Sequence, residues 1–271
     1  MTELQWVEFE MLKEFVRICE QLGLKYFLVC GSALGAVKYN GFIPWDDDID
    51  VALPRPDYEI FCEKAQLMLP KYLFLQNYKT DSHYPLFMSK IRDSRTTFVE
   101  PLYKKLPMHH GIYIDVFPLD GYPTDAFRML WFERRKRLFN RCRAVHFSYN
   151  RTLHPRAILY LFLHKVLGLW KDISKIVERF DKIASSYSCE QSEIWCNHGN
   201  WQGKLEYADK SQYGEGIEAT FEGLKVRIPE NYDAYLTQKY GDWRTDLPED
   251  KKNAPHRAMI LDLERPYTDY M

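Results

Sequence analysis

A block of carboxylates stands directly before an apolar run in "GFIPWDDDIDVAL", residues 41–53. The block contains four aspartates within five positions: Asp46, Asp47, Asp48 and Asp50. Their charges repel one another, and burying any of them without a partner is unfavourable. A solvated acidic turn does not explain why Asp50 lies inside the apolar sequence "IDVAL". A chain that folds around this segment must therefore bring a cation to it.

Residues 48–53 predict a buried β-strand that ends at Pro54. Because side chains alternate along a strand, Asp48 and Asp50 are expected on one face, with their carboxylates roughly 6 to 7 Å apart. One or two divalent ions can bridge that span, with Mg²⁺ as the first choice and Mn²⁺ as the second. An EF-hand is excluded, because Val51 occupies the position that requires glycine. The sequence therefore indicates a metal site at this strand.

A second device for binding anions precedes the acidic block. Residues 25–30, "KYFLVC", predict a buried strand, Gly31-Ser32 predicts a tight turn, and "ALGAVKY" predicts a short helix that begins at the serine. Gly31 lets the backbone approach an anion, Ser32 offers a hydroxyl, and the helix dipole favours negative charge. The G-x-G-x-x-G and G-K-[ST] fingerprints are both absent. The segment thus predicts a phosphate cradle that faces the acidic strand across a loop.

Residues 111–121, "GIYIDVFPLDG", alternate as expected of a strand with one face in the core. One predicted face carries Ile112, Ile114 and Val116, and the other carries Tyr113, Asp115 and Phe117. An unpaired carboxylate in the middle of such a strand would be costly. Asp115 is therefore a candidate for the same site.

Residues 86–100, "LFMSKIRDSRTTFVE", predict a β-hairpin that turns at Asp93-Ser94. Lys90 and Arg92 alternate on its first strand, so they share a face and could contact the phosphates of a substrate. An ordinary solvated pair of cations is the alternative interpretation. The two residues are therefore candidates for substrate binding.

The pattern divides the chain into two parts. Apolar residues recur three or four apart in residues 4–22, and Gly23 follows, so an amphipathic opening helix is expected. Helical patterns dominate residues 123–187. We predict an α+β catalytic half, residues 1–122, packed on a mostly helical half, residues 123–271, that binds the acceptor and completes the active site.

Composition narrows the class of protein. The 271 residues are 46% hydrophobic with a formal net charge of −1, which gives no general attraction to nucleic acid. The first residues lack the pattern of a signal peptide, and no apolar run reaches the roughly 18 residues of a membrane span, so a cytoplasmic location is expected. The six cysteines are scattered without a C-x-x-C pair and predict reduced thiols, and Cys189, Cys196 and His198 lack a fourth zinc ligand nearby.

Residues 128–156 are rich in arginine and lysine and contain Glu133 as their one acidic residue. The next segment, "AILYLFLHKVLGLW" (157–170), is nearly all apolar but too short to span a bilayer. Together they indicate a phosphate-rich acceptor or peripheral contact with an anionic membrane surface that carries a lipid-linked precursor. A solvated helix beside a buried core helix is the alternative. The sequence does not indicate an oligomeric state.

The order of these motifs resembles a known superfamily. Gly-Ser, a short helix, an Asp-x-Asp strand and a third aspartate on a later strand are similar to the nucleotidyltransferases typified by DNA polymerase β. More narrowly, "GSALGAVKYNGFIPWDDDIDVALPRPDYEIF", "KIRDSRTTFVE", "GIYIDVFPLDG" and "YDAYLTQKYGDWRTDLP" resemble the LicD family, which is related to the fukutin-type ribitol phosphate transferases. The resemblance extends from about Phe27 to His256 and implies a polymerase β-like mixed sheet flanked by helices.

Members of the LicD family move phosphocholine from CDP-choline onto bacterial cell-surface glycans. The resemblance implies the same donor here, a teichoic acid or lipopolysaccharide type of precursor as acceptor, and CMP as product. It makes Asp48 and Asp50 the Mg²⁺-binding pair, and it makes Asp115 a ligand of a second ion or the acceptor of the hydroxyl proton. The roles of Asp46 and Asp47 stay open.

Three alternatives to phosphocholine transfer stay open at this point. The chain could use another CDP-activated alcohol, such as CDP-ribitol, or transfer a nucleotide from CTP or another nucleoside triphosphate. It could also be a non-catalytic partner that keeps the fold, although its complete set of Asp48, Asp50 and Asp115 disfavours that alternative.

Further candidates follow from the chemistry of choline. Its quaternary ammonium offers no hydrogen-bond donor, so recognition requires aromatic faces, to which a carboxylate could be added. Trp45 directly precedes the acidic block, and Tyr240 and Trp243 lie in the "KYGDW" part of the resemblance; core packing is the alternative for each ring. His256, in "NAPHRA", is a candidate for proton transfer at neutral pH, without a visible partner.

Overall fold

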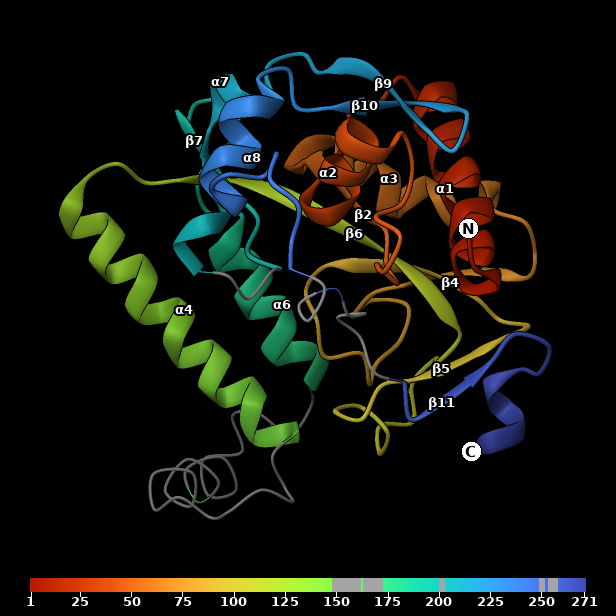
Figure 1. The fold of residues 1–271 in the computed structure, drawn as a ribbon. Coiled ribbons are helices and arrows are strands. Elements are labelled where there is room, and N and C mark those ends of the chain that lie inside the picture. The colour runs from red at the N-terminus through yellow and green to blue at the C-terminus, as the bar shows by residue number, and fades with distance from the viewer. Residues whose placement is uncertain (148–161, 163–172, 200–202, 249–251, 253–257) are drawn as a thin grey trace.

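The computed structural model describes residues 1–147, 162, 173–199, 203–248, 252 and 258–271. Seven strands form one mixed sheet with the path β1-β2-β6-β4-β3, to which β7 is added on β6 and β8 on β7 (Figure 1). The strands are β1 (Phe27–Leu28), β2 (Asp50–Pro54), β3 (Leu73–Gln76), β4 (Ser89–Asp93), β6 (Ile112–Tyr122), β7 (Ile194–Cys196) and β8 (Tyr207–Asp209). The α+β class predicted from the sequence is confirmed, while the polymerase β-like assignment stays a prediction.

The long strand β6 is the centre of the sheet. Its first half runs parallel to β2 and antiparallel to β4, and its last residues pair with β7. In this register Asp115 is the partner of Asp50 on β2 and of Lys90 on β4. Because neighbouring strands lie about 4.8 Å apart and paired side chains project from the same face, these three residues form one row across the sheet.

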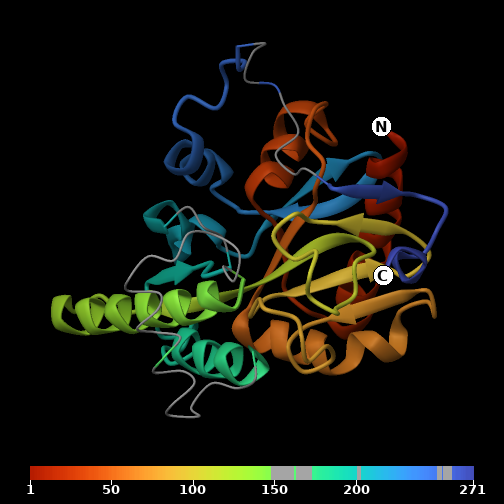
Figure 2. The same cartoon turned by 90° about the horizontal axis from the view of Figure 1, so that it is seen from below.

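Helices cover both faces of the sheet. They are α1 (Glu3–Leu22), α2 (Cys30–Tyr39), α3 (Arg55–Met68) and α8 (Tyr232–Tyr240). Helices α1 and α3 pack in one apolar cluster with Ile114 of β6, whereas α2 and α8 share a second cluster with Phe117 (Figures 1 and 2). Since Ile114 and Phe117 face opposite sides of β6, the predicted alternation of this strand is confirmed.

The opening helix lies where the sequence predicts it. Thr2 and Gln5 form a capping box at its start, and Gly23 ends it in the left-handed region, with φ of 65°. Its core side includes Leu12 and Phe15, both without exposed surface. The amphipathic pattern therefore gave the position of α1 and its buried face correctly.

The remaining described elements are α4 (Ala126–Phe147), α6 (Ile173–Ala184), η1 (Gly203–Glu206), α7 (Lys210–Tyr213), η3 (Tyr267–Tyr270) and the strands β5 (Thr97–Val99), β9 (Ile217–Phe221), β10 (Leu224–Ile228) and β11 (Ile260–Asp262). Helices α4 and α6 pack together, and α4 extends away from the sheet (Figures 1 and 2). They agree with the helical pattern of the second half, whereas residues 157–170 lie almost entirely outside the described part. In that described part, no helix is long and apolar enough to cross a membrane.

Three local predictions are wrong. Helix α2 begins at Cys30, which has a φ of 52°, and not at the serine two residues later. Strand β2 begins at Asp50, so Asp48 lies in the preceding loop. The predicted hairpin does not form, because β5 pairs with β11 near the C-terminus and not with β4. Contacts between distant segments explain two of these differences. At the start of α2, Cys30 N donates to the Tyr235 hydroxyl at 3.1 Å, and β5 has its partner strand near the C-terminus.

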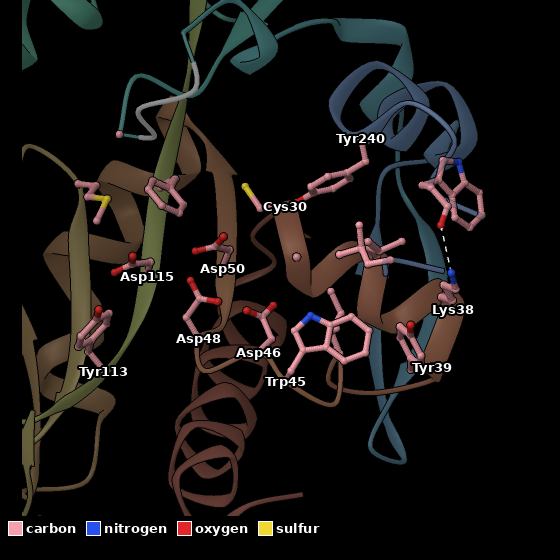
Figure 3. A pocket seen from close by; sticks show the side chains of 18 of the residues that line it. Cys30, Lys38, Tyr39, Trp45, Asp46, Asp48, Asp50, Tyr113, Asp115 and Tyr240 are labelled. Carbon is pink, nitrogen blue, oxygen red and sulfur yellow. Dashed lines mark hydrogen bonds between the residues drawn. The ribbon is translucent and has the colours of Figure 1, made fainter. Parts of the chain in front are cut away.

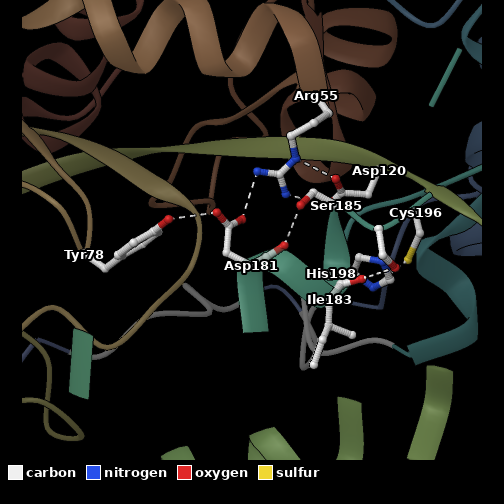
Figure 4. A network of polar contacts seen from close by, with 9 residues as sticks. Arg55, Tyr78, Asp120, Asp181, Ile183, Ser185, Cys196 and His198 are labelled. Atoms are coloured by element: carbon white, nitrogen blue, oxygen red, sulfur yellow. Dashed lines mark hydrogen bonds and ion pairs between the residues drawn. The ribbon is translucent and has the colours of Figure 1, made fainter. Parts of the chain in front are cut away.

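A buried ionic network joins the two halves of the chain (Figure 4). Arg55, the first residue of α3, contacts both carboxylate oxygens of Asp120 on β6, at 2.6 and 2.7 Å. Its third nitrogen donates to Asp181 of α6 at 2.9 Å, and Tyr78 donates to the other oxygen of Asp181 at 2.9 Å. A bidentate pair of this kind fixes geometry as well as charge. The sheet, which also continues into β7 and β8, is thus tied to the second half.

Candidate active site

The acidic block and the third aspartate meet in one cavity of about 520 Å³. Figure 3 shows four carboxylates side by side along one wall, those of Asp46, Asp48, Asp50 and Asp115. Strand pairing places Asp50 beside Asp115. Asp48 reaches the same wall from the loop before β2, so it shares the cavity with Asp50 although it is not part of the strand.

Lys90 completes the row across the sheet. Its Nζ lies 2.7 Å from Asp115 Oδ1 and 3.2 Å from the centre of the Tyr113 ring. The Lys90 side chain is only 3% exposed. This ion pair lacks the alignment of a hydrogen bond, so among the described residues the buried Asp115 Oδ1 has no hydrogen-bond partner. Lys90 therefore balances the charge of Asp115, and a carboxylate that lines the cavity is the kind of group that binds Mg²⁺.

Asp46 is held against the start of α2. A Cβ atom on Gly31 would lie 2.6 Å from Asp46 Oδ2, so glycine is required for this close approach. Gln5 Nε2 donates to the Asp46 carbonyl oxygen at 2.8 Å and fixes the loop to α1. One carboxylate oxygen from each of Asp46, Asp47 and Asp48 lies within 4.8 Å of the others. The structure therefore adds Asp46 to the cavity wall, a role that the sequence left open.

Burial and mutual repulsion raise the proton affinity of this wall. Burial, and then the charge of Asp48, raises the pKa of Asp46 to about 8. Burial, and then the charge of Asp115, raises the pKa of Asp50 to about 7. Glu8 of α1 is buried as well, and its pKa is raised by burial and by Asp48. A set of clustered carboxylate oxygens fits Mg²⁺, whose binding would displace the protons.

We expect the metal-free protein to lose stability as the pH rises from about 6.5 to 8. Folded Asp46 and Asp50 bind protons more tightly than the unfolded chain, whose aspartates have a pKa near 4, so release of these protons disfavours the folded state. Buried His109, whose pKa burial lowers to about 3, has the opposite effect only below about pH 6.5. Melting temperatures measured with and without Mg²⁺ should show a larger gain from Mg²⁺ at pH 8.

Two variants sharpen this measurement. Asp46→Asn should reduce the pH dependence of the metal-free protein, because it removes one of the two shifted carboxyls. Glu63→Gln removes a charge from the exposed side of α3 and should leave the pH dependence unchanged. A melting temperature that rises with pH in this range, or a gain from Mg²⁺ that is independent of pH, would contradict a metal site at the acidic wall.

The predicted phosphate cradle is partly engaged inside the protein. Ser32 is buried, and its Oγ accepts a hydrogen bond from Asp50 N at 2.8 Å. The amide of Cys30, at the start of the helix, is bound to the Tyr235 hydroxyl. Gly31 lines the cavity, whereas Ser32 does not. Ser32 thus positions the strand that carries Asp50, and its contact with a substrate stays a prediction.

Aromatic rings line the cavity on both sides: Figure 3 shows Tyr113 beside Asp115, and Trp45 and Tyr240 on the side away from it. The lining includes all three rings that the sequence singled out: Trp45, Tyr240 and Trp243. Tyr39 joins them, with its ring 6.1 Å from that of Trp45 in an edge-to-face arrangement. Lys252 Nζ lies 5.1 Å from the Trp45 ring centre, so this ring already contacts an ammonium group.

Residues 23–150, which contain all four aspartates of the cavity wall, match the family described as LicD/FKTN/FKRP, nucleotidyltransferase domain. The chain carries a LicD-family domain. It is 28% identical over 265 residues to the lipopolysaccharide cholinephosphotransferase LicD of Haemophilus influenzae, a match that covers 94% of this chain and 95% of the relative. The family resemblance predicted from the motifs is confirmed.

Two further relatives are uncharacterized proteins. The chain is 26% identical over 121 residues to one from Rickettsia typhi, which covers 42% of this chain and 38% of that protein. It is 33% identical over 64 residues to one from Rickettsia prowazekii, which covers 24% of this chain and 23% of that protein. Both matches cover less than half of each protein, and the names of these relatives state no activity.

Within the LicD-family domain, Lys90 and Arg92 have different surroundings. Lys90 lines the cavity and Arg92 does not. The buried guanidinium of Arg92 donates to the side chain of Gln76 and, at 2.6 Å, to the Gly111 carbonyl oxygen. Arg92 is fully buried, its Nη2 has no hydrogen-bond partner among the described residues and lies 3.9 Å from Glu100 Oε2, and its contact with a phosphate stays a prediction. His256 lies outside the described residues.

The support behind Asp50 comes from residues that the sequence does not predict as part of the site. Lys239 of α8 and Glu206 form a buried ion pair, with 2.6 Å between Nζ and Oε1. The Cys30 thiol and the Lys239 ammonium oppose the rise that burial causes in the pKa of Asp50. No signal in the sequence identifies this role, because a lysine in "TQKYGDW" is typical of an exposed helix face and its burial depends on the docking of α8.

Proposed function

We propose that this protein transfers phosphocholine from CDP-choline to a hydroxyl of a bacterial cell-surface glycan precursor of the lipopolysaccharide type and releases CMP. A teichoic acid type of precursor is the alternative acceptor. The observation that carries the proposal is the lining of one cavity by carboxylates and by aromatic rings. Carboxylates with Mg²⁺ suit a pyrophosphate, and aromatic faces suit a quaternary ammonium. The name of the Haemophilus influenzae relative supports the same choice.

In the proposed reaction the acceptor hydroxyl attacks the choline-bearing phosphorus. A new oxygen–phosphorus bond forms while the bond between that phosphorus and the CMP oxygen breaks. Asp48 and Asp50 would hold Mg²⁺, with Asp46 beside them. When bound, Mg²⁺ supplies neutralisation of the charge on the phosphates. Asp115 would hold a second ion or accept the hydroxyl proton, and Lys90, 2.7 Å from its Oδ1, would balance its charge.

Product analysis tests the reaction. We expect the wild-type protein to release CMP from CDP-choline and to move a choline label onto purified lipopolysaccharide, and we expect Asp50→Asn to do neither. CMP from CDP-ribitol, without a reaction of CDP-choline, would indicate a different donor, and pyrophosphate from CTP would indicate nucleotidyl transfer. Failure with all three donors would favour the non-catalytic alternative and contradict the proposal.

Binding of the donor tests the aromatic side separately. We expect CDP-choline to bind more tightly than CDP-ethanolamine, because the trimethylammonium group has no hydrogen to donate and is recognised by aromatic faces, whereas the ethanolamine ammonium donates hydrogen bonds and loses more when it leaves water. Trp243→Ala or Trp45→Ala should reduce this preference by roughly 1 to 2 kcal/mol without abolishing CMP binding. Trp6→Ala, which removes an exposed tryptophan of α1, is the matched control. Equal affinities for the two donors in calorimetry would rule out aromatic recognition of choline.

A further inference from the structure

One face of α4 exposes large apolar side chains. The exposed fractions are 68% for Phe127, 45% for Leu130, 50% for Trp131 and 44% for Leu138. Their spacing of three, four and eleven residues from the first places them on one side of the helix, along about 16 Å of its axis. We call these four residues the α4 stripe. It projects from the body of the protein with the helix that carries it (Figure 2).

A different face attaches α4 to the protein. Phe132 is only 4% exposed, and its ring centre lies 5.5 Å from that of Tyr122 on β6. Glu133 accepts a hydrogen bond from the Tyr207 hydroxyl, and Lys136 Nζ donates to the same hydroxyl oxygen at 2.7 Å. The helix therefore has a packed face as well as the α4 stripe. An ordinary surface helix has one apolar side, so a second one indicates a surface that binds something.

Positive charge flanks the α4 stripe. Four arginines of the same helix are exposed: Arg128, Arg134, Arg135 and Arg137. The guanidinium of Arg134 lies 6.0 Å from the centre of the Trp131 ring. Residues 126–139 contain one acidic residue, Glu133, and its side chain is turned to the packed face. The occupant of the α4 stripe should therefore be apolar at its centre and negatively charged at its edge.

We infer that the α4 stripe docks on a membrane surface that contains anionic phospholipids. Tryptophan, phenylalanine and leucine can enter the boundary between headgroups and acyl chains, and arginine can contact the phosphates at the same depth. A second copy of the chain fits less well, because a two-fold contact through the α4 stripe would bring the arginines of both copies together. The inference does not depend on the proposed reaction.

Sedimentation of the full chain with lipid vesicles tests the inference. One set of vesicles contains phosphatidylcholine alone, and the other also contains phosphatidylglycerol. We expect binding to the second set at low salt and a clear decrease at high salt. Replacing both Phe127 and Trp131 with serine should weaken binding roughly tenfold or more. Replacing Arg134, Arg135 and Arg137 with glutamine should weaken it by about fivefold for each charge.

The controls separate docking from loss of structure and from self-association. Leu67→Ser removes an apolar side chain of α3 that is 91% exposed and should leave binding unchanged. Each variant should keep a melting temperature close to that of the wild type, since the packed face of α4 is unchanged. The inference is overturned by equal sedimentation of wild type and both α4 variants, or by a wild-type dimer in light scattering that the Phe127 and Trp131 replacements dissociate.

Discussion

Replacing Asp50 with asparagine is expected to lower the rate of phosphocholine transfer by several orders of magnitude without unfolding the protein. Asp50 is buried at the start of β2, beside Asp115 and at the cavity wall. In the proposed function its charge holds the ion that binds the pyrophosphate, so its loss should raise the barrier by roughly several kcal/mol. Asp48→Asn should have the same effect, because Asp48 reaches the same wall from the loop.

Although activity falls, the stability of the metal-free Asp50→Asn protein should stay the same or increase. Burial and the charge of Asp115 raise the pKa of Asp50 to about 7, so its ionised form destabilises the metal-free protein at pH 8. Asparagine is neutral at every pH, and the metal-free variant should melt at the same temperature as the wild type or higher. Glu63→Gln again serves as the control for charge. A variant that keeps more than about a tenth of the wild-type turnover at saturating Mg²⁺ would remove Asp50 from the site.

The parts of the site that the sequence predicted are those that depend on local alternation. Asp115 could be found because a carboxylate at the centre of an alternating strand needs a partner, and the structure places it on the cavity side of β6 with Tyr113 and Phe117. Asp50 could be found for the same reason. The chemistry of burial identifies such residues even before their partner strands are known.

The parts that the sequence did not predict depend on contacts between distant segments. Asp46 enters the cavity wall because Gly31 admits it and Gln5 fixes its loop, which involves three separate stretches of chain. Lys239 reaches the back of the site through the docking of α8. The hairpin prediction is wrong for the same reason, since the partner strand of β5 lies near the C-terminus. Local propensity cannot choose between a nearby and a distant strand.

Asp115→Asn also changes the surroundings of Lys90. The lysine is nearly buried and lies 2.7 Å from the carboxylate, so asparagine would remove the carboxylate that pairs with its ammonium. Breaking a buried pair from one side is destabilising, here by up to roughly 3 kcal/mol, because the Tyr113 ring still contacts the cation. A loss of rate in this variant alone would therefore not separate a catalytic role from a structural one.

A second replacement separates the two roles. Asp115→Asn combined with Lys90→Met removes both charges and should recover much of the stability that the single variant loses. If Asp115 holds the second ion or accepts the acceptor proton, transfer in the double variant should stay lower by orders of magnitude, while CDP-choline affinity changes little because Asp46, Asp48 and Asp50 remain. Lys90→Met alone measures the contribution of the lysine to stability and to turnover. Melting temperature, donor affinity and turnover on the three variants decide the matter: a double variant that is stable and fully active would end the assignment of Asp115 to the reaction.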